Sequence, residues 1–192
     1  MIDKALGTLA DGLQNYLVRI PGLNISSREP VALKHVVEYD GSLALPDESL
    51  GIFLVNIEEE RVTRSQIGHL TGPDGTVSHV NPEVKLNLYI VVAANFSKYK
   101  TGLEYLSGAI RFFQGKSVFT PDNTPEMEPA IQKLIVEMIT LSFEQQNHLW
   151  GSLGAKYLPS VLYRVRMLIM QEAMAFDEQP PVTTIRFAAK GS

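Results

Sequence analysis

The sequence predicts an α/β fold of the α+β type, in which a mixed, largely antiparallel sheet is flanked by helices. Amphipathic stripes at helical spacing alternate with short segments rich in β-branched residues. Residues 84–96 are apolar on both sides, as a central strand covered on both faces is. A Pro-Asp-Gly run marks a hairpin turn. With 192 residues, 45% of them hydrophobic, one domain buries a core without metals or disulfides.

The N-terminal segment predicts a helix from about Asp3 to Ile20. Its apolar residues recur at helical spacing, and Pro21 ends the pattern because proline disfavours helical geometry in the residue before it. Residues 30–39 and 50–59 are rich in β-branched residues and are separated by turn formers. Both are therefore predicted strands.

A hairpin is predicted within residues 61–83, as a solvent-exposed excursion before the central strand. A three-residue loop, 73–75, would place His69 and His79 directly opposite each other. Two imidazoles make an incomplete zinc site, because zinc usually takes at least three protein ligands. We interpret the segment as an exposed hairpin with incidental histidines.

The second predicted helix covers residues 97–116 and ends at Gly115. Its expected buried stripe consists of Tyr99, Leu103, Leu106, Ile110 and Phe113. Gly102 and Gly108 lie inside the helix without a preceding glycine-rich turn. We interpret them as close-packing positions.

The second half of the chain predicts a short extended piece at 118–119 and then strand, helix, strand. Residues 130–141 alternate with a period of two and predict a strand. Ser142 and Gln145 match a capping box, so a helix follows to about Leu153 and ends at Gly154. Residues 160–170 alternate again, which places two arginines on one face of a strand.

The end of the chain is Pro180-Pro181 followed by a β-prone run, residues 182–188. We expect an α/β domain over residues 1–178 and an extended tail over residues 179–192. Two possibilities stay open for the tail. It adds as an edge strand to another subunit, or it pairs within its own sheet or is disordered.

The composition excludes several classes of protein. The 17 basic and 21 acidic residues include no Lys/Arg block able to neutralise a row of phosphates, so nucleic acid is not an expected partner. The absence of cysteine excludes disulfides, thiolate zinc sites and cysteine nucleophiles, and it fits synthesis in a reducing cytoplasm. No signal peptide pattern and no run of about 18 apolar residues is present, so no membrane span is expected.

The sequence predicts no catalytic, cofactor-binding or metal residue. The nucleophile elbow and the phosphate-binding glycine loops are absent. Ser160 opens a strand with no base placed beside it, and His148 is expected on a helix surface. His35 and Glu38 are three apart on a predicted strand, so they point to opposite faces and cannot share a metal.

One stretch carries a specific pattern, Asn-x-Leu-Trp-x-x-Leu-Gly followed by Tyr-x-Pro-Ser-x-x-Tyr-x-x-Arg. Its residues are Asn147, Leu149, Trp150, Leu153, Gly154, Tyr157, Pro159, Ser160, Tyr163 and Arg166. With the strand VKLNLYIVVAANF, the helix YLSGAIRFFQGKSVFT, the upstream GIFLVNIEEE and the N-terminal amphipathic helix, it resembles the cap, or tail-terminator, family of phage-tail-like contractile injection systems. The resemblance runs from Ile2 to about Gln171.

The resemblance implies a non-enzymatic building block with a tail-terminator-like fold. It would form a hexameric ring that ends the growth of the inner tube and sheath, with copies of itself, the tube protein and the sheath protein as partners and with no cofactor. It implies a component of an injection particle, released or membrane-associated with it. A baseplate or adaptor role in the same particle is the alternative. A small-ligand enzyme with a pocket beneath Trp150 and Tyr157 is the third hypothesis.

A closed ring needs a heterologous interface, in which one surface meets a different surface of the next copy. The candidate interface residues are Arg164, Arg166, Val182, Ile185, Arg186 and Phe187. For the two arginines, two roles stay open: they bind a carboxylate within the fold, or they face the next subunit. Trp150 and Tyr163 are interpreted as packing residues.

Overall fold

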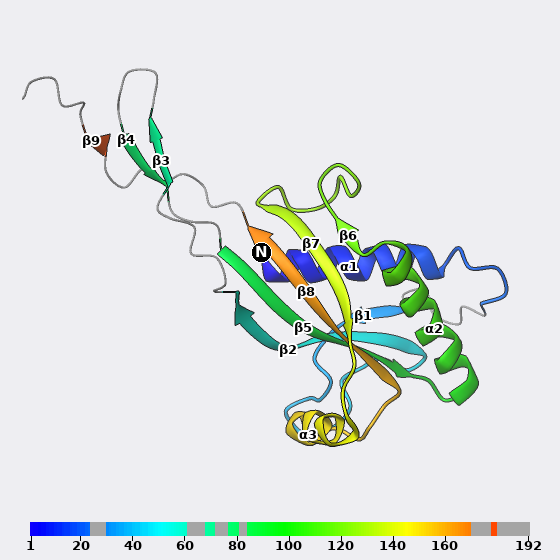
Figure 1. The fold of residues 1–192 in the computed structure, drawn as a ribbon. Helices are drawn as coiled ribbons and strands as arrows, with labels where there is room; N and C mark the ends of the chain where they lie inside the picture. Colours follow the sequence, from blue (N-terminus) through cyan, green and yellow to red (C-terminus); the bar gives the residue numbers. More distant parts are fainter. Residues whose placement is uncertain (24–29, 61–67, 72–76, 81–83, 170–177, 180–192) are drawn as a thin grey trace, which may run out of the picture.

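The computed structural model describes residues 1–23, 30–60, 68–71, 77–80, 84–169 and 178–179. These residues form three helices and nine strands (Figure 1). The elements are α1 (Ile2–Leu17), β1 (Val31–Leu33), β2 (Ser49–Glu59), β3 (Gly68–Thr71), β4 (Val77–Val80), β5 (Val84–Asn95), α2 (Tyr99–Gly115), β6 (Val118–Phe119), β7 (Ile131–Ile139), α3 (Phe143–Leu153), β8 (Ser160–Ile169) and β9 (Glu178–Gln179).

The main sheet has six strands in the order β1-β2-β5-β8-β7-β6. Only β1 and β2 are parallel, and every other neighbouring pair is antiparallel. The prediction of a mixed, largely antiparallel sheet is therefore confirmed. A second sheet, β3-β4-β9, lies beyond the end of β5 that is remote from α3 (Figure 1).

The central strand β5 is covered on both faces, as its sequence predicts. Leu88, Ile90 and Val92 are fully buried in the larger core, which α1 and α2 form with one face of the sheet. Val91 and Ala93 point to the other face, where a smaller cluster packs beneath α3. Figure 1 shows α1 behind the sheet, α2 at its right-hand side and α3 at its lower end. Each fully buried aliphatic side chain contributes roughly 1.5–3 kcal/mol, so most of the core stability lies on the α1/α2 face.

α1 ends at Leu17, three residues before the predicted end at Ile20. The N–H groups of Arg19 and Ile20 donate to the carbonyls of Tyr16 and Leu17, three residues back. The last turn is thus tightened, as often happens at helix ends. The helix stops ahead of Pro21 rather than at it.

The predicted strand 30–39 is wrong beyond Leu33, where β1 ends. The chain turns instead, and His35 Nε2 lies 3.1 Å from Glu38 Oε2. Lys34 Nζ lies 3.2 Å from the other carboxylate oxygen of Glu38. The expectation that His35 and Glu38 point to opposite faces fails because it assumed strand geometry. Both contacts lower the pKa of the exposed Glu38 carboxyl, and the hydrogen bond with His35 is the larger cause.

α2 exists where predicted, but its buried face is rotated from the expected stripe. Leu106 and Phe113 of that stripe are buried as expected, but Tyr99 and Leu103 are exposed, and Tyr105 and Phe112 are buried in addition. Gly108 lies on this buried face, where a Cβ would lie only 2.6 Å from Leu17 Cδ2. The glycine lets α2 approach α1 closely, and this face turns inward. Its interpretation as a close-packing position is confirmed.

The second half of the chain follows the predicted order. β6, β7, α3 and β8 form as expected, and β7 pairs with β8 from Ile131↔Ile169 to Ile139↔Leu162, with a register shift between Ile131 and Lys133. Among the residues described, no helix has the length and apolar character needed to cross a membrane.

Candidate functional site

The signature segment forms α3 and the start of β8, joined by a short connection. Ser142 Oγ accepts a hydrogen bond from the N–H of Gln145 at 3.2 Å, and the Ser142 N–H donates to Gln145 Oε1 at 2.9 Å. The predicted capping box is therefore present. Gly154 ends the helix with a φ of 67°, the left-handed conformation that glycine adopts without strain. These two ends fix where α3 lies.

Trp150 packs between α3 and the sheet, as its interpretation as a packing residue requires. It is 4% exposed, and its ring meets Phe53 edge-on at 6.4 Å between centroids. Tyr157 stands against it on the outer side at 5.7 Å and is itself 58% exposed. The indole N–H of Trp150 is buried without a hydrogen-bond partner among the described residues.

Tyr163 belongs to the opposite face of the sheet and is also a packing residue. It is almost fully buried in the larger core, with its ring 4.9 Å from that of Phe113. Its hydroxyl has no hydrogen-bond partner within the described residues. Burial raises the pKa of this phenol to about 12. Trp150 and Tyr163 therefore serve two separate clusters rather than one pocket.

The remaining signature residues have structural places. Leu149 and Leu153 pack into the cluster beneath α3, and Asn147 is exposed. The Pro159 carbonyl accepts a hydrogen bond from the N–H of Ala94 at 2.9 Å, which starts the β5–β8 ladder. Ser160 opens β8, as predicted.

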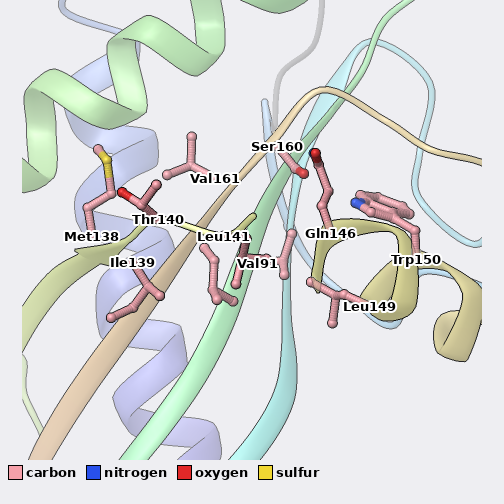
Figure 2. A pocket seen from close by; sticks show the side chains of 11 residues that line it. Val91, Met138, Ile139, Thr140, Leu141, Gln146, Leu149, Trp150, Ser160 and Val161 are labelled. Carbon is pink, nitrogen blue, oxygen red and sulfur yellow. The ribbon is translucent and has the colours of Figure 1, made fainter. Parts of the chain in front are cut away.

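A cavity of about 230 Å³ lies between α3 and the sheet (Figure 2). Its lining comes from β5 (Val91), the end of β7 and the residues after it (Met138–Leu141), α3 (Gln146, Leu149, Trp150) and β8 (Ser160–Leu162). None of these side chains is charged. In Figure 2 the nitrogen of Trp150 faces Gln146, and Ser160 lies nearby. Sequence reasoning placed a possible pocket at Trp150 but missed Gln146 and the β7 wall, which only tertiary packing brings there.

Arg164 and Arg166 share one carboxylate, that of Glu137 on the neighbouring strand. Arg164 Nη2 lies 2.6 Å from Glu137 Oε2, and Arg166 Nη2 lies 2.7 Å from Oε1. About a third of each side chain is exposed. The structure thus gives the arginines the first of their two open roles, a carboxylate within the fold. Glu137 was missed, although the alternation of both predicted strands places it on the arginine face.

The pair extends into a polar row across the sheet. Tyr89 on β5 is the register partner of Arg164, and its hydroxyl donates to Glu58 Oε2 at 2.9 Å. The Arg164 hydrogen bond is the main cause of the lowered pKa of Glu137, with Arg166 adding to it and desolvation opposing it. The pKa of Tyr89 is raised, first by its hydrogen bond to Glu58. The row lies on the sheet face that carries α3.

The hairpin prediction is confirmed in its register, since His69 pairs with His79. The loop residues 72–76 lie outside the described residues, so the predicted loop length is untested. In the part of the chain that the structure describes, no group of three or more His, Asp or Glu side chains could hold a metal ion. Four candidate interface residues, Val182, Ile185, Arg186 and Phe187, also lie outside the described residues.

Comparisons with known proteins place the chain in a family. The family model described as the Pvc16 N-terminal domain matches residues 6–184. No curated protein matches. Two cryo-EM structures have a similar fold, each with a TM-score of 0.63.

The first of these structures is the sheath/tube terminator of the PVC extracellular contractile injection system in its extended state. It is 13% identical, and the match covers 100% of this chain and 64% of that one. The second is the tube terminating cap of the anti-feeding prophage, 14% identical, with 98% of this chain and 61% of that one covered. The chain therefore spans less than two thirds of either neighbour. With the family model covering nearly its whole length, the chain belongs to the Pvc16 N-terminal domain family.

Proposed function

We propose that this protein is a structural cap of a contractile injection system, a non-enzymatic tail terminator. It forms a hexameric ring on the inner tube and sheath and ends their growth. The observation that carries the proposal is the shared fold. Caps of two injection systems match essentially the whole chain at a TM-score of 0.63, and the family model spans residues 6–184.

The chemistry of the cavity supports a structural rather than a catalytic role. None of its eleven lining side chains is an acid, a base or a cation. General acid–base catalysis needs a titratable group within hydrogen-bonding reach of the substrate. An enzyme using the pocket beneath Trp150 would lack such a group among the residues that line it.

The ring requires a heterologous contact between copies, and the tail supplies a means. A segment led by Pro180-Pro181 can add as an edge strand, with main-chain hydrogen bonds providing affinity. We expect deletion from Pro180 onward to leave the α/β domain folded while weakening ring formation or sheath attachment. Unchanged assembly of the deletion variant would exclude a role of the tail.

Light scattering and negative-stain microscopy of the purified chain, alone and with tube and sheath protein, test the proposal. The expected result is a ring of six copies at one end of the tube. A protein that stays monomeric with both partners present would contradict it. A gold-labelled tag distinguishes the alternative of a baseplate or adaptor, because it would mark the needle end of the particle.

A further inference from the structure

We propose that the cavity beneath α3 and the adjoining free edge of β7 form the receptor for the C-terminal segment Val182–Phe187 of a neighbouring copy. This inference rests on the proposed ring and deepens it by naming both halves of one subunit contact. It brings together four observations: an uncharged cavity, a buried donor without an acceptor, an open strand edge and a segment that falls short of its own cavity.

The cavity fits apolar side chains rather than a metabolite. Its volume of about 230 Å³ lies below the roughly 300–1,000 Å³ of sites for drug-sized ligands. It exceeds the roughly 150 Å³ that is enough for a benzene-sized group in a protein interior. Ile139, Leu149 and Leu162 supply apolar walls, and no lining residue is charged. An occupant with one or two neutral apolar side chains satisfies these walls.

One hydrogen-bond donor in the cavity wall has no acceptor within the part of the chain that the structure describes. Trp150 is buried, with 4% of its surface exposed, and its indole N–H is inaccessible to solvent and has no hydrogen-bond partner in the described residues. Figure 2 shows this nitrogen directed toward Gln146, with Ser160 close by. A buried donor without an acceptor costs free energy that an incoming carbonyl, or Gln146 displaced by the occupant, would recover. A peptide offers such carbonyls together with apolar side chains.

Within the described part of the chain, the edge of the sheet next to the cavity is open. β6 pairs with β7 only at Leu134 and Ile135, and the Ser117 carbonyl accepts the N–H of Val136. Beyond Val136, β7 has no second neighbouring strand among the described residues. Met138, which is 45% exposed, and Thr140 line the cavity at this edge. A strand added here would place alternate side chains over the cavity.

The segment Val182–Phe187 has the matching pattern. In an extended chain Ile185 and Phe187 point to one side, and Arg186 points to the other. The apolar pair would enter the uncharged cavity while the arginine stays outside it. Pro180 and Pro181 have no N–H to pair, so strand addition would begin after them.

The position of β9 favours insertion of the segment into another copy rather than into its own cavity. Val91 of the cavity lies seven residues into β5 from Val84, about 23 Å at the usual strand rise. β9 lies beyond that end of β5, away from α3 (Figure 1). From Gln179 to Ile185, six residues span at most about 21 Å. Ile185 therefore falls short of the cavity of the same copy, which favours insertion in trans, and insertion in trans closes a head-to-tail ring.

The single tryptophan makes the test direct, because intrinsic tryptophan fluorescence reports on Trp150 alone. The full chain is titrated with a synthetic peptide of residues 178–192. We expect a saturable change in emission. Gln146→Phe, which fills the cavity mouth, should weaken binding about tenfold or more. His148→Phe, at an exposed position of α3 that does not line the cavity, should leave it within about twofold.

Peptide variants test the occupant. Replacing Ile185 and Phe187 with aspartate should weaken binding of the peptide about tenfold or more. Thr184→Asp changes a residue on the opposite side of the strand and should have little effect on binding. No saturable change with the native peptide, equal binding by a scrambled peptide, or equal binding by the Gln146→Phe chain would overturn the inference.

Ring formation on tube and sheath is measured separately. Rings without peptide binding would overturn this inference and leave the proposed function standing. Peptide binding without rings would support the receptor and contradict the proposed function.

Discussion

Glu137 on β7 accepts a hydrogen bond from Arg164 on β8, with 2.6 Å between Oε2 and Nη2. The two residues are register partners, and Arg166 holds the other oxygen of the same carboxylate at 2.7 Å. One acid thus offsets two cations that lie on the same face of one strand. Removing the Glu137 carboxylate would leave two positive charges side by side. Glu137 is therefore the most informative charged residue to replace.

We expect Glu137→Gln to lower the free energy of unfolding by about 1 kcal/mol near neutral pH, a modest value because a third of the pair is exposed to solvent. The pKa of Glu137 is lowered from its ordinary 4.5. Its contribution is therefore present above about pH 4.5 and is lost as pH falls through the lowered value. Denaturant unfolding at a series of pH values checks this: the difference from wild type should vanish in acid. Glu104→Ala, which removes an exposed contact to Lys100, is the control and should change stability by less than about 0.5 kcal/mol.

Tyr163→Phe should stabilise the protein by about 1 kcal/mol, because it removes a buried hydroxyl without a partner in the described residues. Tyr89→Phe is the matched variant and should destabilise the protein, because it loses the hydrogen bond to Glu58. Thermal unfolding separates the two. A destabilised Tyr163→Phe would mean that the hydroxyl has an acceptor.

The same tyrosine predicts a loss of stability in alkali. Its pKa is raised from 10.0 to about 12, so the unfolded chain releases this proton first. The free energy of unfolding is therefore unaffected by this group below pH 10 and falls as pH rises toward 12, by up to about 2–3 kcal/mol. Between pH 10 and 12, the free energy of unfolding should fall less steeply with pH for Tyr163→Phe than for wild type. Equal slopes would contradict the burial of the phenol.

Replacing glycine by alanine at two helix positions should change the free energy of unfolding in opposite directions. Gly7 in α1 has open space around a built Cβ, so Gly7→Ala should stabilise by about 0.5–1 kcal/mol through helix propensity. At Gly108 the Cβ would lie 2.6 Å from Leu17, which is fully buried, so Gly108→Ala should destabilise by about 1 kcal/mol despite the same propensity gain. Urea unfolding of both variants decides it. Stabilisation at both positions would show that α1 and α2 separate easily.

Ser142→Ala should lower the free energy of unfolding by about 1 kcal/mol, because the Gln145 N–H loses its acceptor at the start of α3. Ser152→Ala is the control, since its hydroxyl bonds only to a carbonyl within α3. Because α3 is one wall of the cavity, the emission of Trp150 should move toward that of a solvent-exposed indole in Ser142→Ala alone. An unchanged spectrum with lowered stability would mean that fraying stops short of Trp150.

Local patterns predicted most of the elements correctly, and their errors share one cause. The capping box, Gly154 and the alternation of 130–141 and 160–170 act through neighbours in the chain, so the sequence contains the whole interaction. The buried face of α2 depends on what packs against it, and hydrophobic spacing alone placed Leu106 and Phe113 correctly but Tyr99 and Leu103 wrongly. His35 and Glu38 were misplaced because β propensity does not reveal where a strand loses its partner.

The sequence by itself determined the order and type of the elements, the hairpin register and the family resemblance, because periodicity, turn chemistry and caps are local properties. Only the tertiary structure decided that Glu137 joins both arginines, that Trp150 and Tyr163 serve opposite faces, and that α3 leaves a cavity beside an open strand edge. These features arise from pairing between β7, β8 and α3, and sheet order is set by the summed burial of the whole core rather than by any one segment.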